Sequence, residues 1–262
     1  MPTVEINGVE VAYARTGHGP PLVLVHGAGL DGRMWEPQLS ALSEDFTVAA
    51  WDEPGAGRSS DLPAGFGLAD FAHALAAVIE ALQLGPAHVA GLSWGGTVAL
   101  ELYRHHPELV RTLLLVDTYA GWKGSLPPEE VAVRVEGARR MLAVPRERFD
   151  PVLPGLFADG PPATFTPLLD AMAHDVRPET MGAQLLMMAE ADERDVLPAI
   201  SVPTLLLWGE LDARSPLSVA RAFKEGIPHA DLLVLPGVGH VSNLEAPDRF
   251  NEAVRGFCRA HD

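Results

Sequence analysis

The sequence predicts an α/β fold in which helices cover both faces of a mostly parallel β-sheet. Three observations support this prediction. Short apolar runs bounded by Gly, Pro or Asp recur along the chain, as expected for strands buried on both faces. The segments between these runs have helical spacing. A length of 262 residues with 47% hydrophobic content is sufficient for one large domain, or for one domain that carries an insertion.

The predicted strands follow in order from the N-terminus. Residues 4–6 and 9–13, on either side of Asn7-Gly8, predict a hairpin with a tight turn. Six further apolar runs predict buried strands at residues 22–25, 46–50, 88–90, 112–116, 204–208 and 231–235. Residues 68–84 and 97–106 lie between these runs and have the spacing of helices.

One region departs from this alternation of strands and helices. Between residues 120 and 197 no strand-like run occurs, and the sequence predicts helices near 128–142, 146–157, 166–173 and 178–190. An insertion of this length between two core strands predicts a helical cap over the carboxyl edge of the sheet. We therefore expect a core domain of residues 1–119 and 198–262, with the cap at residues 120–197.

The charge balance excludes several classes of partner. A net charge of −16 repels phosphate backbones and anionic membranes, and no cluster of Lys and Arg offsets it. The first residues have no signal-peptide pattern, and no apolar run approaches the roughly 18 residues that span a bilayer. We expect a soluble cytoplasmic protein that acts on a small molecule without a cofactor or metal ion. Its oligomeric state stays open.

The stretch Gly91-Leu92-Ser93-Trp94-Gly95-Gly96 carries the first catalytic signal. A G-x-S-x-G pattern between a strand and a helix is a nucleophile elbow, a sharp turn that exposes a serine. Small neighbours such as Gly91 and Gly95 let the helix pass close to the strand. The pentapeptide alone is weak evidence, but here it follows a predicted strand and precedes a predicted helix. Ser93 is therefore the candidate nucleophile.

A serine nucleophile requires a base, and the base requires an acid that fixes its tautomer. His240 directly follows the last predicted strand, from which it can reach Ser93 at the carboxyl edge of the sheet. Asp212 follows the strand at 204–208 and gives the chain order serine, acid, histidine. Asp117 is the rival acid because it ends the strand at 112–116, and Glu210 is a weaker candidate.

Acyl transfer also requires N–H donors for the developing oxyanion. The loop His26-Gly27-Ala28-Gly29 follows the first core strand and is of the kind that supplies one donor, while the residue after the nucleophile supplies another. The predicted donors are the backbone N–H groups of Ala28 and Trp94. His26 is expected to hold the loop by hydrogen bonds. Whether the Trp94 indole shapes the pocket or packs in the core stays open.

These motifs together resemble the α/β-hydrolase superfamily over essentially the whole chain. The resemblance rests on HGAG at 26–29, DEPGAGRS at 52–59, GLSWGG at 91–96, WGELD at 208–212 and GH at 239–240. It implies an eight-stranded, mostly parallel sheet, a cap inserted after the sixth strand, and a triad of Ser93, Asp212 and His240. The 52–59 segment is similar to a family loop that is mainly structural.

Within this superfamily the chain is similar to small carboxylesterases and lactonases, including enol-lactonases and acyl-homoserine lactonases. This similarity implies a serine hydrolase that cleaves carboxylic esters or lactones through an acyl-enzyme. Cofactor-free perhydrolases of the haloperoxidase type, prolyl aminopeptidases and small-molecule receptors of the same fold stay open as alternatives. An apolar pocket would suit an ester or lactone, and its candidate residues are Leu30, Trp35, Trp122, Met141, Met187 and Met188.

Overall fold

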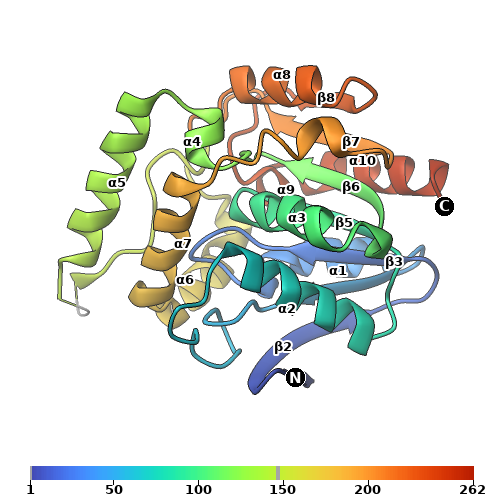
Figure 1. The fold of residues 1–262 in the computed structure, drawn as a ribbon, viewed down its shortest axis with the longest axis horizontal. Coiled ribbons are helices and arrows are strands. Elements are labelled where there is room, and N and C mark those ends of the chain that lie inside the picture. The colour runs from blue at the N-terminus through green and yellow to red at the C-terminus, as the bar shows by residue number, and fades with distance from the viewer. Residues whose placement is uncertain (1, 146–147) are drawn as a thin grey trace.

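A single eight-stranded sheet forms the centre of the molecule (Figure 1). The computed structural model describes residues 2–145 and 148–262. The strands are β1 (Thr3–Ile6), β2 (Val9–Thr16), β3 (Pro21–Val25), β4 (Thr47–Trp51), β5 (Ala87–Leu92), β6 (Val110–Val116), β7 (Thr204–Gly209) and β8 (Asp231–Leu235). Their order across the sheet is β1-β2-β4-β3-β5-β6-β7-β8. Strand β2 pairs antiparallel with both β1 and β4, and all other neighbouring strands pair parallel.

The helices form a layer on each face of the sheet and a separate group at one edge (Figure 1). They are α1 (Glu36–Leu42), α2 (Leu68–Ala81), α3 (Trp94–His105), α4 (Trp122–Ser125), α5 (Pro128–Leu142), α6 (Thr166–Asp175), α7 (Pro178–Glu190), α8 (Leu217–Gly226), α9 (Ser242–Glu245) and α10 (Pro247–Ala260). Short 3₁₀ helices occur at Gly32–Trp35, Pro107–Leu109, Ala163–Phe165 and Leu197–Ala199. In the described part of the chain, no helix combines the length and apolar character needed to cross a membrane.

The alternation of side chains along the strands produces one apolar core on each face of the sheet. Val23 and Val25 of β3 point into a core that also contains residues of α2, α3 and α8. Leu22 and Leu24 of the same strand point into the opposite core, which contains residues of α1 and α10. Both faces are therefore covered, which explains why the central strands read as continuous apolar runs. The predicted α/β architecture is confirmed.

The predicted hairpin at the N-terminus is also present. Asn7 and Gly8 have φ angles of 51° and 83°, and they join β1 to β2 in an antiparallel pair. Two consecutive residues with positive φ make a turn whose twist matches that of the flanking strands, and Asn-Gly is the favoured sequence for it.

Helices α4 to α7 lie between β6 and β7, and Figure 1 shows them together at one edge of the molecule. One predicted helix of this insertion, at residues 146–157, is wrong. Residues 146–147 lie outside the described residues, and residues 148–157 contain no α-helix. Pro151 and Pro154 explain the difference, because each lacks the N–H group that a helix interior needs.

Candidate active site

Ser93 occupies the sharp connection between β5 and α3. Its φ of 55° and ψ of −117° lie in a region that non-glycine residues rarely adopt, as expected for a nucleophile elbow. The neighbouring glycines leave no room for a side chain: a Cβ on Gly91 would overlap Gly95 O, and a Cβ on Gly95 would overlap Val25 O. The backbone N–H of Ser93 donates to Val116 O at 2.9 Å, which ties the turn to β6.

His240 and Asp212 are paired by a hydrogen bond. The Nδ1 atom of His240 lies 2.8 Å from Asp212 Oδ2. The other carboxylate oxygen of Asp212 accepts the backbone N–H groups of Arg214 and Ser215, each at 2.8 Å. With a proton on Nδ1, the Nε2 atom of His240 is the acceptor nitrogen of the ring. This Nε2 is buried and has no hydrogen-bond partner among the described residues.

One cavity brings the predicted nucleophile and base together. Ser93 and His240 both line it, and its volume of about 20 Å³ is sufficient for a water molecule. Its other lining residues are Gly27, Ala28, Leu30, Leu92, Leu153, Leu156, Leu185, Met188, Arg214 and Val241. Residues from the loops after β3, β5, β7 and β8 therefore meet residues of the insertion at this point.

A larger apolar cavity adjoins the first. It has a volume of about 140 Å³ and shares Leu30, Leu156 and Val241 with the cavity that contains Ser93. Apart from Gly29, its remaining walls come from the 151–161 segment and from α6, and include Phe157, Thr166, Leu169 and Ala173. The two cavities therefore lie next to each other and share part of their lining.

Asp117, the rival acid, makes different contacts. Its Oδ1 accepts the backbone N–H of Gly209 at 2.7 Å, and its Oδ2 has no hydrogen-bond partner among the described residues. Burial and the nearby charge of Asp212 raise the pKa of Asp117 well above its ordinary range. Asp117 therefore ionises less readily than an exposed aspartate, and the carboxylate that is hydrogen-bonded to His240 is that of Asp212.

The 26–29 loop is held by hydrogen bonds of His26. Its Nδ1 lies 2.9 Å from Gly27 O, and its Nε2 accepts the backbone N–H of Glu53 at 3.1 Å. Trp94 begins α3, where a backbone N–H has no intrahelical acceptor. Within the described residues, neither Ala28 N nor Trp94 N has a hydrogen-bond acceptor. Both N–H groups are thus available to an oxyanion.

Glu53 connects the elbow to the insertion, a role that the sequence motif did not indicate. This carboxylate is fully buried and accepts the indole N–H of Trp94 at 2.9 Å and an N–H of the Gln184 side chain in α7. The Oε1 of Gln184 in turn accepts the backbone N–H of Gly29 at 3.1 Å. Burial raises the pKa of Glu53 to about 7.

The predicted pocket residues separate into two groups. Leu30 and Met188 line the cavity with Ser93. Trp35 packs on Phe250 in one core, while Trp122 packs with Tyr119, and Met141 and Met187 lie against the other core. These four side chains are not among the described residues that line the cavity. The Trp94 indole packs edge-on against Phe71, which places it in the core.

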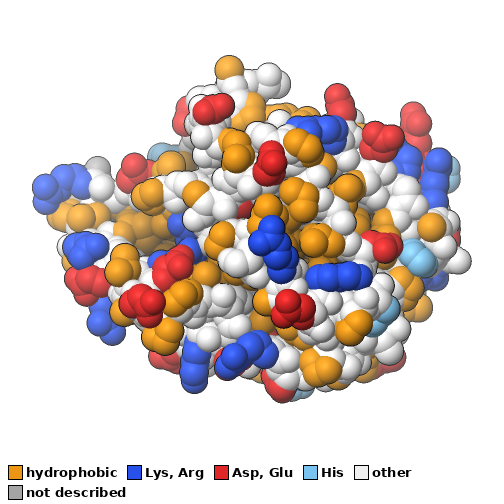
Figure 2. Space-filling view, turned by 90° about the horizontal axis from the view of Figure 1, so that it is seen from above, with side chains coloured by type: hydrophobic (Ala, Val, Ile, Leu, Met, Phe, Trp, Pro, Cys, Tyr) orange, Lys and Arg blue, Asp and Glu red, His pale blue; other side chains and the backbone are white. Residues whose placement is uncertain are grey.

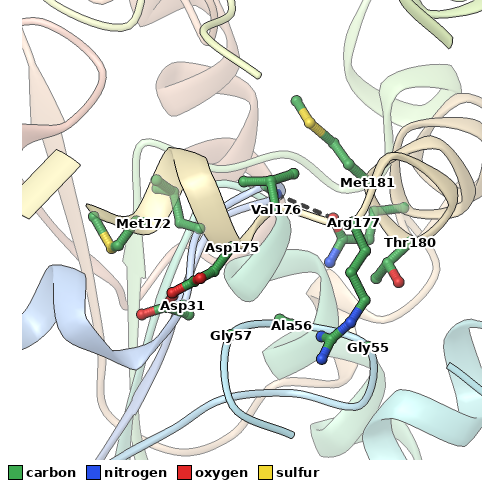
Figure 3. A pocket seen from close by; sticks show the side chains of 13 residues that line it. Asp31, Gly55, Ala56, Gly57, Met172, Asp175, Val176, Arg177, Thr180 and Met181 are labelled. Carbon is green, nitrogen blue, oxygen red and sulfur yellow. Dashed lines mark hydrogen bonds between the residues drawn. The ribbon is translucent and has the colours of Figure 1, made fainter. Parts of the chain in front are cut away.

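The junction between α6 and α7 is fastened to the core beside this site, and Figure 3 shows it with Asp31, Asp175 and Arg177 labelled. Arg33 bridges Asp31 and Asp175 at 2.6 and 2.7 Å. Arg177, two residues after Asp175, donates to Ser59 O at 2.9 Å and pairs with Asp61 at 2.9 Å. These contacts set the position of α7, which carries Gln184, Leu185 and Met188.

Comparison with known proteins gives a consistent result. The model of the alpha/beta hydrolase family matches residues 22–253. RutD of Azorhizobium caulinodans, a relative named for carbamate hydrolysis, is 31% identical over 279 residues and covers 98% of each chain. A solved thermophilic esterase from Thermogutta terrifontis is similar at 33% identity, with a TM-score of 0.84 over 99% of this chain and 97% of that one. The enol-lactonase from Burkholderia xenovorans LB400 is similar at 26% identity, with a TM-score of 0.82 over 98% and 100% of the two chains.

Proposed function

This chain belongs to the alpha/beta hydrolase family, and from that premise we propose that it hydrolyses carboxylic esters or lactones. The observation that carries the proposal is that His240 lines the cavity of Ser93 with its Nδ1 held by Asp212 and its Nε2 without a hydrogen-bond partner among the described residues. The solved esterase and enol-lactonase of the same fold support this class of substrate. We propose that residues 120–197 act as the cap over this site.

In the proposed mechanism, His240 Nε2 takes the hydroxyl proton of Ser93 as Oγ attacks the substrate carbonyl. The N–H groups of Ala28 and Trp94 receive the oxyanion, and each could contribute about 3 kcal/mol to the transition state. When the intermediate collapses, the imidazolium gives its proton to the leaving alcohol. Asp212 stabilises the imidazolium while it exists.

The acyl-enzyme is then hydrolysed by the same groups. His240 removes a proton from water, the hydroxide attacks the acyl carbonyl, and Ser93 leaves with that proton. In a lactone the alcohol produced in the first step stays attached to the acyl chain. The apolar lining suits carbon-rich substrates, and the 140 Å³ cavity offers space for such a chain.

Replacement of the nucleophile tests this mechanism. Ser93→Ala is expected to lower kcat/KM for p-nitrophenyl esters and lactones by roughly 10⁴-fold or more, because no acyl-enzyme can form. Ser40→Ala, at an exposed position of α1, is the matched control and should retain full activity. A fluorophosphonate probe should label the wild type and fail to label Ser93→Ala. Hydrolysis that survives in Ser93→Ala would contradict the mechanism.

A substrate panel separates the alternatives. The name of the Azorhizobium relative favours carbamates as a second candidate, and carbamates are attacked at a carbonyl by the same groups. The panel therefore compares an ester, a lactone, a carbamate and a prolyl anilide, with peroxide present in one series to detect perhydrolysis. Ester or lactone turnover at the highest kcat/KM supports the proposal. Tight ligand binding with at most one turnover supports a receptor instead.

A further inference from the structure

Arg214 brings a positive charge to a cavity that is otherwise almost apolar. Arg214 lines the same cavity as Ser93 and His240. The other lining side chains are those of leucine, methionine, valine and alanine, apart from glycine. Arg214 comes from the loop after β7, two residues beyond Asp212, and is half-buried.

The guanidinium of Arg214 has no carboxylate partner in the described part of the chain. Its Nη1 donates to the backbone oxygen of Pro154 at 3.2 Å, and this is its one hydrogen bond to those residues. Other half-buried arginines, such as Arg33 and Arg134, each pair with a carboxylate. Among the half-buried arginines that the structure describes, Arg214 alone lacks a carboxylate within ion-pair distance.

The charged residues near Arg214 do not provide the missing carboxylate partner. Asp212 is close in sequence, but its two oxygens are occupied by His240 Nδ1 and by the backbone N–H groups of Arg214 and Ser215. Arg134 approaches from α5 and donates to the backbone oxygen of Arg214 at 2.6 Å. The charge of Arg134 is balanced by Glu130 at 2.6 Å. Donors of Arg214 are thus left for a group that enters the cavity.

We propose that Arg214 is a specificity-determining residue that selects substrates carrying a carboxylate at the far end of an apolar chain. The inference rests on the proposed function and names its substrate class. A guanidinium presents a planar fork of donors that matches a carboxylate, and low-dielectric surroundings strengthen the pairing. Leu153, Leu156 and Met188 line the same cavity, where the carbon chain between this carboxylate and the ester at Ser93 would lie against them.

The direction of the pKa of Arg214 agrees with this geometry. Burial lowers the pKa of its guanidinium, although an arginine still remains protonated at neutral pH. The guanidinium is therefore a partly desolvated cation without an ion-pair partner among the described residues, and a substrate carboxylate would compensate that cost on binding.

A matched pair of substrates tests the inference. p-Nitrophenyl hexanoate and mono-p-nitrophenyl adipate have the same leaving group and chain length, and they differ in the terminal carboxylate. We expect Arg214→Met to lower kcat/KM for the adipate ester by ten- to a hundredfold, mainly through KM, because the pairing holds the bound substrate. Activity on the hexanoate ester should change by less than about threefold. Arg214→Lys, which retains the charge without the fork, should fall between the wild type and Arg214→Met.

The control and a second measurement make the result decisive. Arg221→Gln removes an exposed arginine of α8, and it should leave the ratio between the two substrates unchanged. Calorimetric titration with adipate should give at least a tenfold weaker Kd for Arg214→Met than for the wild type, whether or not either ester is hydrolysed.

Two outcomes would overturn the inference. If Arg214→Met lowers kcat/KM equally for both substrates, the role of Arg214 is to hold the chain around Pro154 in place. The inference also fails if the wild type prefers the neutral ester and binds adipate no better than Arg214→Met does. Arg214 would then not form a binding site for a carboxylate. Failure of the wild type on both esters, with adipate binding that depends on Arg214, would reject the proposed function and retain the anion site.

Discussion

Glu53 is the residue whose environment differs most from what its type would suggest. It is a carboxylate that is fully buried beside the elbow, and its hydrogen bonds reach Trp94 in the core and Gln184 in the insertion. The folded protein therefore keeps a proton on Glu53 at pH values where an exposed glutamate would have lost it. The free energy of unfolding should therefore depend on pH in the range where Glu53 holds this proton.

The predicted signature is a stability difference that depends on pH. The pKa of Glu53 is raised from 4.5 to about 7 in the folded state, so the folded chain holds one proton more than the unfolded chain in this window. The free energy of unfolding of the wild type should fall as pH rises from about 4.5 to 7. Glu53→Gln lacks this titration, and its stability relative to the wild type should rise by roughly 3 kcal/mol over the same range.

Urea denaturation of both proteins at half-unit pH steps measures this difference. Glu252→Gln, at an exposed position of α10, is the control and should follow the wild type. Because other buried carboxyls such as Asp117 are present in both proteins, their contribution cancels in the comparison. A difference that stays constant from pH 4.5 to 7 would show that Glu53 is not protonated in the fold.

At the scale of elements, the close approach of α3 to the end of β3 determines how Ser93 is presented. Gly95 lies where the first turn of α3 passes the end of β3. A Cβ at this position would lie 2.6 Å from His26 O and would overlap Val25 O. Both are backbone atoms of a central strand and its loop, so they cannot rotate away as a side chain can.

Gly95→Ala is therefore expected to be strongly destabilising. The helix would have to move away from the sheet, at a cost of about 3 kcal/mol or more, and Ser93 would move with it. Gly256→Ala is the matched control, because Gly256 lies within α10 and a Cβ there meets open space. This control should gain roughly 0.5–1 kcal/mol, since alanine is the better helix former. Thermal denaturation of both variants distinguishes the two effects.

The strands and most helices could be predicted from the sequence because their signals are local. Each central strand is a short apolar run, and the elbow combines a strand, three glycines and a helix within a few residues. The prediction of a helix at 146–157 is wrong because it is based on the spacing of apolar residues alone. Leucines and a phenylalanine recur there at helical intervals, but Pro151, Pro154 and Gly155 interrupt the hydrogen bonding.

The site is less predictable at the scale of the whole molecule, because it depends on how the insertion packs on the core. Ser93, Asp212 and His240 could be proposed from sequence since each follows a strand at the same edge of the sheet. The link from Glu53 through Gln184 to Gly29 joins positions that are more than a hundred residues apart. No local pattern reports such a contact, nor the position of Arg214 in the cavity.

The excess of acidic residues also acts on the molecule as a whole. On the face shown in Figure 2, acidic and basic side chains are interspersed with hydrophobic ones, yet the chain carries a net charge of −16. Ion pairs such as Arg104–Asp195 relieve some of the repulsion locally. The remainder opposes the compact state, because folding brings like charges together.

Salt should therefore stabilise the fold at neutral pH. Raising NaCl from about 10 to 100 mM shortens the Debye length from about 30 to 10 Å and screens this repulsion. The free energy of unfolding should rise by an amount on the order of 1 kcal/mol, which corresponds to about 2–4 °C in Tm. The same titration near pH 4.9, the isoelectric point, is the control and should show no stabilisation. A decrease with salt at pH 7 would mean that ion pairs outweigh the net charge.

The order of the strands along the chain has a consequence for biosynthesis. Ser93 follows β5, whereas His240 follows β8 and comes 147 residues later in the chain. Because a chain is made from its N-terminus, the elbow emerges from the ribosome long before the loop that carries its proposed base. A nascent chain thus contains an unactivated serine, and the proposed hydrolase can begin work only after the segment that carries His240 has been translated.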